Sequence, residues 1–315
     1  MTRLIHSNAG FIRSLQMSRA RFFAFVEGRL DRVFFDRLLE QECCSREIGY
    51  QVFAMKELPG ATGGKSVLLS NFQDFRGRGL LKTTAFGKTM ACVFVADKDS
   101  DDFCGRQLRS PHLIYSPSYD LEAHLFNCGD LQRALADSCG ITLEQARSLI
   151  PDPRAWLIGA ARAWKDWIAL CLICQCRRVN CGCTFDRQSA INPEPFGPPN
   201  AMELEAFKVK LTAALCISRA EFDDLYSTTS ERVEASLRAN EPMRFFKGKW
   251  LSHLIQSFLS SRPRPADANF NGVGERLTLT LVAQVGNNAH CCCCAPYAHK
   301  VRTLLASTLP VATET

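Results

Sequence analysis

The hydrophobic residues of the first 126 positions alternate between short continuous runs and a helical stripe. Residues 21–26, 91–96 and 112–115 form apolar, β-prone runs, each followed by polar residues. Residues 31–41 instead repeat apolar positions at helical spacing. Strands without a hydrophilic face, separated by helical patterns, are typical of a parallel sheet covered by helices. We therefore predict an α/β core over residues 20–128, with a parallel sheet flanked by helices.

From about residue 130 the hydrophobic period becomes helical. We expect helices over residues 130–138, 142–149, 153–176, 202–215, 219–239 and 250–259, with a proline-rich break at 192–200. Residues 277–285 form one further β-prone run. The predicted organisation adds to the core a mainly helical region (129–260) that completes or caps it. A C-terminal segment (261–315) follows, with oligomerisation as its candidate role.

The composition is that of an ordinary folded protein. The chain has 315 residues, of which 22% are charged and 46% hydrophobic, and this excludes disordered and collagen-like classes. The start lacks the apolar core of a secretory signal, and no apolar stretch reaches the ~20 residues that span a bilayer. We expect a cytoplasmic protein without membrane association, and a transit peptide is the less favoured alternative. Most of the 16 cysteines would then be reduced, buried hydrophobic residues.

Two acidic clusters follow predicted strands. Glu27 ends the first strand, and Asp31 lies one helical turn further on. Asp97 and Asp99 follow the strand at 91–96. The carboxyl ends of parallel strands form the ligand-binding edge of an α/β sheet, and carboxylate oxygens gathered there suit Mg²⁺ or Mn²⁺. Any one of these acids alone fits a solvated turn better, and it is the pairing of the clusters that favours a metal site.

These residues resemble a known family. Glu27-Gly28-x-x-Asp31 followed by Asp97-x-Asp99 resembles the TOPRIM domain, and the Glu-Gly-x-x-Asp form resembles its OLD-type nuclease branch. Three further pieces, at 63–65, 119–125 and 247–251, are similar to a stand-alone bacterial TOPRIM family. That family includes the effector nuclease of the PARIS anti-phage defence system. The resemblance covers roughly residues 20–255.

The resemblance implies a Mg²⁺-dependent endonuclease, which is a hydrolase acting on phosphodiester bonds. Glu27, Asp97 and Asp99 would hold the metal, and Asp31 would assist a second ion. It also implies a toxin effector of antiviral defence that cleaves RNA such as tRNA rather than DNA. Such an effector would be controlled by a partner ATPase and be a homo-oligomer when active. A non-catalytic module that binds nucleic acid or a partner through the same acids is the alternative.

Three further residues are candidates for this site. Glu122 is an added metal ligand, or else an acid in the first turn of a helix, where it favours the helix dipole. Asp120, two residues earlier, has the same two readings. Lys249 is a candidate to stabilise charge on the scissile phosphate, or else begins a helix.

Basic residues are candidates for phosphate contacts. Residues 75–90 contain four basic side chains and no acid, and the glycine-rich stretch 60–66 contains a fifth; the five are Lys65, Arg76, Arg78, Lys82 and Lys88. The glycine-rich stretch is one residue short of a P-loop, so we do not expect ATP there. A solvated surface and a plain turn are the alternatives. The formal net charge of only +6 averages these residues with the acidic clusters.

Cysteines cluster twice along the chain. Five of them lie between residues 171 and 183, which is enough for zinc, but the predicted helix there lacks the turns of a zinc knuckle. We do not expect structural zinc. The run Cys291–Cys294 has adjacent side chains that point apart and cannot all bind one ion, and no role is assigned to it.

Overall fold

The computed structural model describes residues 7–187, 199–266, 268–287 and 294–309, which fall into two units. The first unit contains the described residues up to Asp97, those of 108–116 and those from Val282 onward. The second contains residues 98–107 and the described part of 117–281. The chain therefore passes into the second unit directly after Asp97, returns for one strand, and leaves again after Ser116.

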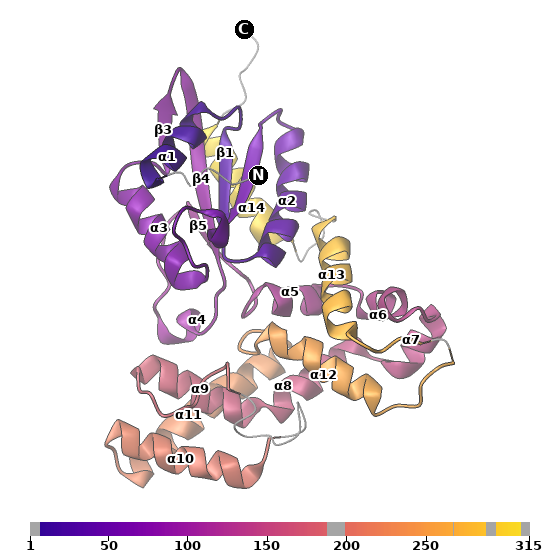
Figure 1. The fold of residues 1–315 in the computed structure, drawn as a ribbon. Coiled ribbons are helices and arrows are strands. Elements are labelled where there is room, and N and C mark those ends of the chain that lie inside the picture. The colour runs from indigo at the N-terminus through magenta and orange to yellow at the C-terminus, as the bar shows by residue number, and fades with distance from the viewer. Residues whose placement is uncertain (1–6, 188–198, 267, 288–293, 310–315) are drawn as a thin grey trace. The chain divides into compact units, whose positions relative to one another are not determined.

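The first unit is built round a five-stranded sheet (Figure 1). Its strands are β1 (Phe22–Val26), β2 (Tyr50–Ala54), β3 (Lys82–Ala85), β4 (Lys88–Ala96) and β5 (Leu113–Tyr115). Their order is β2-β1-β4-β3, and β5 also pairs with β4. All pairs are parallel except β3–β4, which is antiparallel. The α/β class is confirmed, but the sheet is mixed rather than purely parallel.

The antiparallel strand β3 was not predicted because its sequence carries little hydrophobic signal. It is four residues long, and its side chains alternate between exposed and half-buried. The pairing of Ala85 with Lys88 leaves a two-residue turn of Phe86 and Gly87, whose φ angles are 51° and 71°. Two positive φ angles define a type I′ turn, which joins antiparallel neighbours. The basic stretch 75–90 is therefore largely a hairpin.

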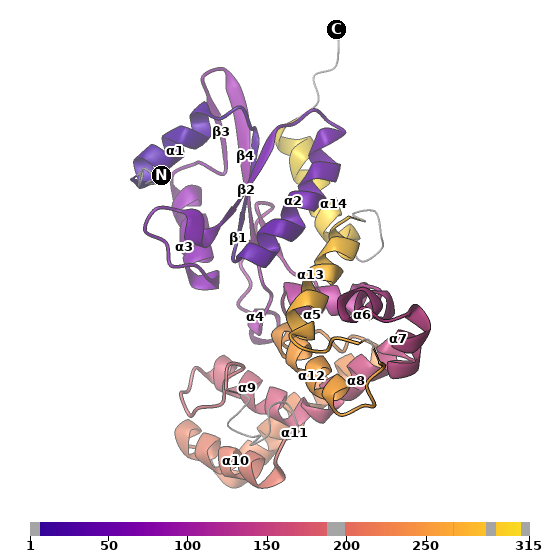
Figure 2. The same cartoon turned by 45° about the vertical axis from the view of Figure 1, so that its right-hand side comes forward.

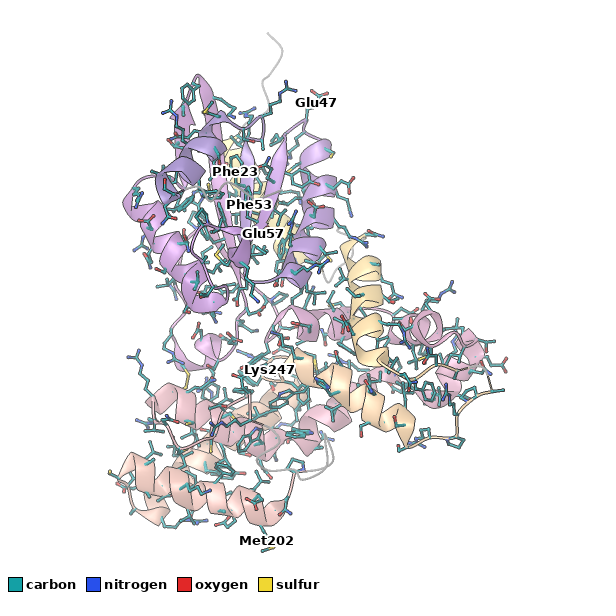
Figure 3. The ribbon with its side chains drawn as sticks, viewed as in Figure 1. Phe23, Glu47, Phe53, Glu57, Met202 and Lys247 are labelled. Carbon is teal, nitrogen blue, oxygen red and sulfur yellow. A yellow bond between two sulfur atoms is a disulfide. The ribbon has the colours of Figure 1, made fainter. Side chains whose placement is uncertain are left out.

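Helices cover both faces of the sheet (Figure 2). The helices of the first unit are α1 (Asn8–Met17), α2 (Arg29–Cys44), the 3₁₀ turn η1 (Met55–Glu57), α3 (Lys65–Gly77) and α14 (Ala295–Thr308). α1 and α3 lie on one face, and α2 and α14 on the other. On the first face Phe72 of α3 contacts Phe94 of β4, with ring centroids 5.6 Å apart. Phe53 of β2, labelled in Figure 3, stacks on Phe25 of β1.

The second unit is helical. Its helices are α4 (Asp101–Cys104), α5 (Leu121–Cys128), α6 (Leu131–Cys139), α7 (Leu143–Leu149), α8 (Pro153–Ala163), α9 (Lys165–Arg177), α10 (Ala201–Leu215), α11 (Arg219–Arg238), α12 (Gly248–Ser260) and most of α13 (Val273–Gly286). Side-chain oxygens of Asp130, Asp152 and Ser218 accept backbone N–H bonds and so begin three of them. The helical character predicted for residues 129–260 is confirmed where they are described.

Two predicted elements are wrong. Residues 153–176 form two helices, because Trp164 ends α8 with a non-helical ψ of 4° before α9 begins. Residues 277–285 are helical within α13, where Leu277, Leu281 and Val285 are buried one turn apart. Most of the proline-rich break at 192–200, and residues 291–293 of the cysteine run, lie outside the described residues. None of the helices within the described ranges combines the length and the apolar character needed to cross a membrane.

One cysteine pair departs from the expectation of reduced thiols. Cys104 of α4 and Cys176 of α9 form a disulfide, with Cα atoms 5.2 Å apart and 72 residues between them in the chain. Other cysteines, such as Cys43, Cys92 and Cys139, are free and buried, as expected of small hydrophobic residues. The expectation of a reduced thiol is therefore wrong for Cys104 and Cys176.

Candidate active site

The structure brings Glu27 and Asp97 together at one edge of the sheet. β1 and β4 are parallel neighbours in which Val26 pairs with Val95, so both strands end at the same level. Glu27 follows β1 and Asp97 follows β4. The Oε1 atom of Glu27 accepts a hydrogen bond from the backbone N–H of Asp97 at 2.8 Å. The two acids predicted to share a site therefore lie side by side.

Asp31 holds the turn that follows Glu27. Its Oδ2 atom accepts a hydrogen bond from the backbone N–H of Gly28 at 3.0 Å, which caps the N-terminus of α2. A Cβ atom at Gly28 would lie 3.1 Å from this same oxygen. The Glu-Gly-x-x-Asp spacing thus has a local explanation, because Asp31 fixes the chain at the point where Glu27 leaves the strand.

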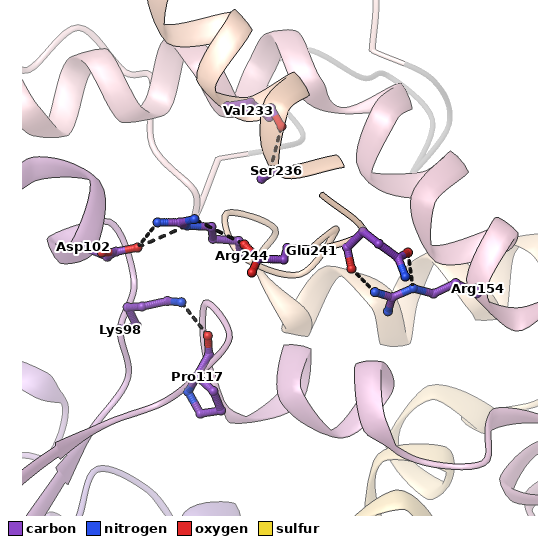
Figure 4. Close-up of polar contacts among 9 residues, drawn as sticks. Lys98, Asp102, Pro117, Arg154, Val233, Ser236, Glu241 and Arg244 are labelled. Atoms are coloured by element: carbon purple, nitrogen blue, oxygen red, sulfur yellow. Dashed lines mark hydrogen bonds and ion pairs between the residues drawn. The ribbon is translucent and has the colours of Figure 1, made fainter. Parts of the chain in front are cut away.

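In the second unit, hydrogen bonds connect the segment after Asp97 to the loop before α5 (Figure 4). The ammonium group of Lys98 is buried and donates to the carbonyl of Pro117 at 2.5 Å. The backbone N–H of Asp99 donates to the carbonyl of Tyr119 at 2.7 Å. Asp99 has a φ of 48°, a left-handed conformation that Asp tolerates better than most residues. Burial lowers the pKa of Lys98.

The helix that follows Lys98 and Asp99 is attached to the rest of the second unit. Asp102 forms an ion pair with Arg244 at 3.1 Å, and Arg244 also pairs with Glu241 (Figure 4). The guanidinium of Arg232 lies 3.7 Å from the ring centroid of Phe103. Together with the Cys104–Cys176 disulfide, these contacts fix the position of the segment that bears Asp99.

Asp120 is a buried acid of the second unit that caps the N-terminus of α5. It is 2% exposed, and its carboxylate accepts backbone N–H bonds from Ala123 at 2.7 Å and from Gly248 at 3.0 Å. Burial, reinforced by the Glu122 charge, raises the pKa of Asp120, and the Lys249 charge opposes this rise. Glu122 is half-buried and Lys249 exposed. The predicted residues Glu122 and Lys249 therefore both lie close enough to Asp120 to affect it.

Sequence reasoning missed the close approach of Gly248 to Asp120. A Cβ atom at Gly248 would lie 1.9 Å from the backbone nitrogen of Ala123 and 2.4 Å from Oδ1 of Asp120. Only glycine therefore fits between α5 and the start of α12. A glycine between Lys247 and Lys249, two residues before the helix expected at 250–259, was the available signal, because glycine permits a close backbone approach that other residues block.

Of the predicted phosphate-binding residues, Lys65 and Arg76 lie at opposite ends of α3. A rise of ~1.5 Å per residue places them roughly 16 Å apart along the helix. Lys65 lies over the ring of Tyr115 at 5.7 Å, and Arg76 lies over the ring of Phe72 at 5.8 Å. The structure therefore does not bring these two cations to one point.

The other three basic residues have structural partners. Arg78 forms an ion pair with Asp74 at 2.9 Å. Lys82 donates to a backbone carbonyl of α14 at 3.2 Å. Lys88 donates to two backbone carbonyls directly after α1, those of Ser18 and Ala20. The partners of Lys82 and Lys88 attach the β3–β4 hairpin to neighbouring helices.

The thiol cluster consists of Cys171, Cys174, Cys181 and Cys183. The Sγ atoms of Cys174 and Cys181 lie 3.7 Å apart, and burial, reinforced by Cys181, raises the pKa of the Cys183 thiol. Burial raises the pKa of Cys174 to about 11, so its thiol is neutral at pH 7. Neutral, mostly buried thiols pack as small hydrophobic residues. A structural zinc ion binds thiolates, so it would have to displace the protons of these thiols. We do not expect structural zinc here.

Over the described ranges, no three His, Cys, Asp or Glu side chains already surround a point where a metal ion would sit. The donors at the sheet edge nevertheless fit the expected ion chemically, since the carboxylates of Glu27 and Asp97 are the hard oxygen ligands that Mg²⁺ prefers. No family model matches the chain, and no curated protein matches it either.

Proposed function

We propose that this protein is a metal-dependent phosphodiester nuclease. The observation that carries the proposal is the hydrogen bond between Glu27 and the backbone of Asp97, which joins the ends of two parallel strands. Its support from sequence is the order of Glu27, Asp31, Asp97 and Asp99, which resembles the TOPRIM pattern. A bound Mg²⁺ or Mn²⁺ would stabilise the attacking and leaving oxygens of the phosphodiester.

The residues of the first unit have distinct roles in this proposal. The Asp97 amide donates to Oε1 of Glu27 and so fixes the orientation of the carboxylate, including its second oxygen. Asp31 keeps the turn at Gly28 closed and thereby fixes the backbone that carries Glu27. Asp97 supplies the second carboxylate from the adjacent strand. Asp99 follows two residues later in the chain and is assigned to the metal on sequence grounds.

The roles proposed for Glu122 and Lys249 rest on their position near Asp120 in the second unit. Both lie near the buried Asp120, whose pKa responds to their charges. We assign Glu122 to a second metal ion, and we assign Lys249 to charge stabilisation at the phosphate. RNA such as tRNA, an ATPase partner, a homo-oligomeric active state and a role in anti-phage defence all rest on the family resemblance.

The test is cleavage of labelled tRNA and of supercoiled plasmid by the purified protein in Mg²⁺, Mn²⁺ or EDTA. We expect tRNA cleavage with either metal and none in EDTA. Glu27→Gln keeps the oxygen that accepts the Asp97 amide and removes the charge, and Asp97→Asn is the equivalent change. Each should lower the rate by roughly 100-fold or more. Asp36→Asn, at an exposed acid of α2, is the matched control and should cleave normally.

Metal-dependent cleavage that survives in both Glu27→Gln and Asp97→Asn would contradict the proposed site. Binding of tRNA without cleavage under any metal condition would instead favour the non-catalytic binding module. Cleavage of plasmid but not of tRNA would retain the nuclease and overturn the RNA assignment.

A further inference from the structure

A shallow hollow beside the β3–β4 hairpin combines exposed apolar and cationic side chains. Its volume is about 570 Å³, and its lining includes Arg13, Met17, Arg19, Phe86 and Lys88. We call these five residues the hairpin patch. None of the residues that line the hollow is acidic. The larger hollow at the end of β2, of about 970 Å³, is lined by both acidic and basic residues, so its charge does not select an anion.

Phe86 occupies a position that phenylalanine does not favour. It is the first residue of the type I′ turn and has a φ of 51°, where Asn, Asp or Gly is preferred. A bulky side chain at positive φ is strained, and such strain concentrates at functional sites. The ring is also 71% exposed, so it gains little from burial. Neither backbone conformation nor packing explains an aromatic residue at this tip.

The rest of the hairpin patch is arranged as a platform. Met17 is 68% exposed and lies one helical turn after Arg13 on α1. Lys88 donates to the carbonyls of Ser18 and Ala20 and so fastens the end of α1 to the start of β4. Figure 1 shows α1 lying beside this hairpin. The apolar surface and the cations therefore keep a fixed spacing.

Arg13 and Arg19 are available to an external partner. Both side chains are exposed. Within the described residues, neither side chain forms a hydrogen bond or an ion pair. Positive charge next to an exposed ring complements a single-stranded nucleic acid, in which phosphates meet the cations and an unstacked base lies on the ring.

We propose that the hairpin patch binds single-stranded nucleic acid, with a base stacked on Phe86 and phosphates contacted by Arg13 and Arg19. The choice of nucleic acid over an anionic membrane rests on the proposed nuclease function. It also rests on α1, whose buried Leu15 packs into the core of the first unit, so the helix does not present a continuous apolar face for insertion into lipid.

The experiment measures the anisotropy of a fluorescein-labelled single-stranded RNA 12-mer in EDTA, where binding is observed without cleavage. Phe86→Asn should weaken binding roughly ten-fold, and Phe86→Trp should bind as the natural protein does. Arg13→Gln and Arg19→Gln should each reduce the slope of log K against log salt by about 0.7. Asn is favoured in a type I′ turn, so Phe86→Asn should melt at the same or a higher temperature.

The controls change one exposed apolar side chain and one exposed arginine elsewhere in the protein. Met202 is 82% exposed on α10 (Figure 3), and Arg147 is exposed on α7; Met202→Ala and Arg147→Gln should leave RNA binding unchanged. Binding by Phe86→Asn within two-fold of the natural protein would overturn the proposal, as would absence of RNA binding at low salt. Binding to phosphatidylserine vesicles that Phe86→Asn abolishes would overturn it in favour of a membrane surface.

The two proposals can fail separately. If no nucleic acid is cut but RNA binding depends on Phe86, the nuclease proposal fails and the hairpin patch stands. If tRNA is cut but Phe86→Asn and the arginine variants bind normally, the hairpin patch fails and the nuclease stands.

Discussion

The contact between Gly248 and Asp120 predicts an unusually large effect for a single added methyl group. In Gly248→Ala, the new Cβ would lie 1.9 Å from the backbone nitrogen of Ala123, which cannot rotate away. The start of α12 must therefore move, and the Gly248 N–H then loses its bonds to the buried carboxylate of Asp120. A hydrogen bond to a charged group contributes about 1.5–3 kcal/mol, and leaving such a group underpaired costs more.

We expect Gly248→Ala to lower the free energy of unfolding by about 3 kcal/mol or more. The matched control is Gly159→Ala within α8, where an added Cβ meets no atom within 4 Å and the glycine is exposed. Because alanine is the better helix former, this control should stabilise the protein by roughly 0.5–1 kcal/mol. The same chemical change thus has opposite signs at two helical positions of one unit.

The assay is urea unfolding followed by tryptophan fluorescence, to which Trp250 of α12 contributes from a buried position. Its Nε1–H donates to the carbonyl of Phe185, so displacement of α12 also changes the surroundings of this ring. If the free energy of unfolding of Gly248→Ala lies within about 0.5 kcal/mol of that of the natural protein, then α5 and α12 do not make the contact described. The role given to Asp120 would then be wrong.

Three further predictions concern stability and metal content. Burial lowers the pKa of His124 to about 4, so below about pH 6.5 the unfolded chain binds a proton that the folded protein does not. The free energy of unfolding should therefore fall by about 2 kcal/mol between pH 7 and pH 5. This fall should be absent in His124→Leu. Cys104→Ser should lower the free energy of unfolding of non-reduced protein by up to about 4 kcal/mol, from the loop that the Cys104–Cys176 disulfide closes, whereas Cys216→Ser at an exposed free thiol should change little. Atomic absorption of purified protein should find far less than one equivalent of zinc, and stoichiometric zinc that is lost on mutating the thiol cluster would contradict this.

The sequence was sufficient to predict a helix or strand where its hydrophobic pattern matches the burial of the residues. All residues of β1 are buried, and its continuous apolar run was recognised for that reason. The helices of 202–215 and 219–239 were recognised from their helical pattern, and the structure adds Asn200 and Ser218 as the residues that cap them. The pairing of Glu27 with Asp97 followed from one rule, that parallel strands end at a common edge.

The sequence was insufficient where contacts between distant residues decide the structure. β3 depends on its pairing with β4 and on a turn that Phe86 begins against its own preference. Cys104 and Cys176 are 72 residues apart, and spacing does not identify such a partner. The five basic residues looked like one group, but Lys82 and Lys88 are held by backbone carbonyls that only the fold brings near.

The most direct test of the central claim is to locate the metal. Fe²⁺ replaces Mg²⁺ at carboxylate sites, and with ascorbate and peroxide it generates hydroxyl radicals that cut the polypeptide next to the bound ion. We predict cuts beside Glu27 and Asp97 that excess Mg²⁺ suppresses and that Glu27→Gln abolishes. Cuts that survive in Glu27→Gln, or cuts confined to the thiol cluster, would contradict a metal site at the ends of β1 and β4.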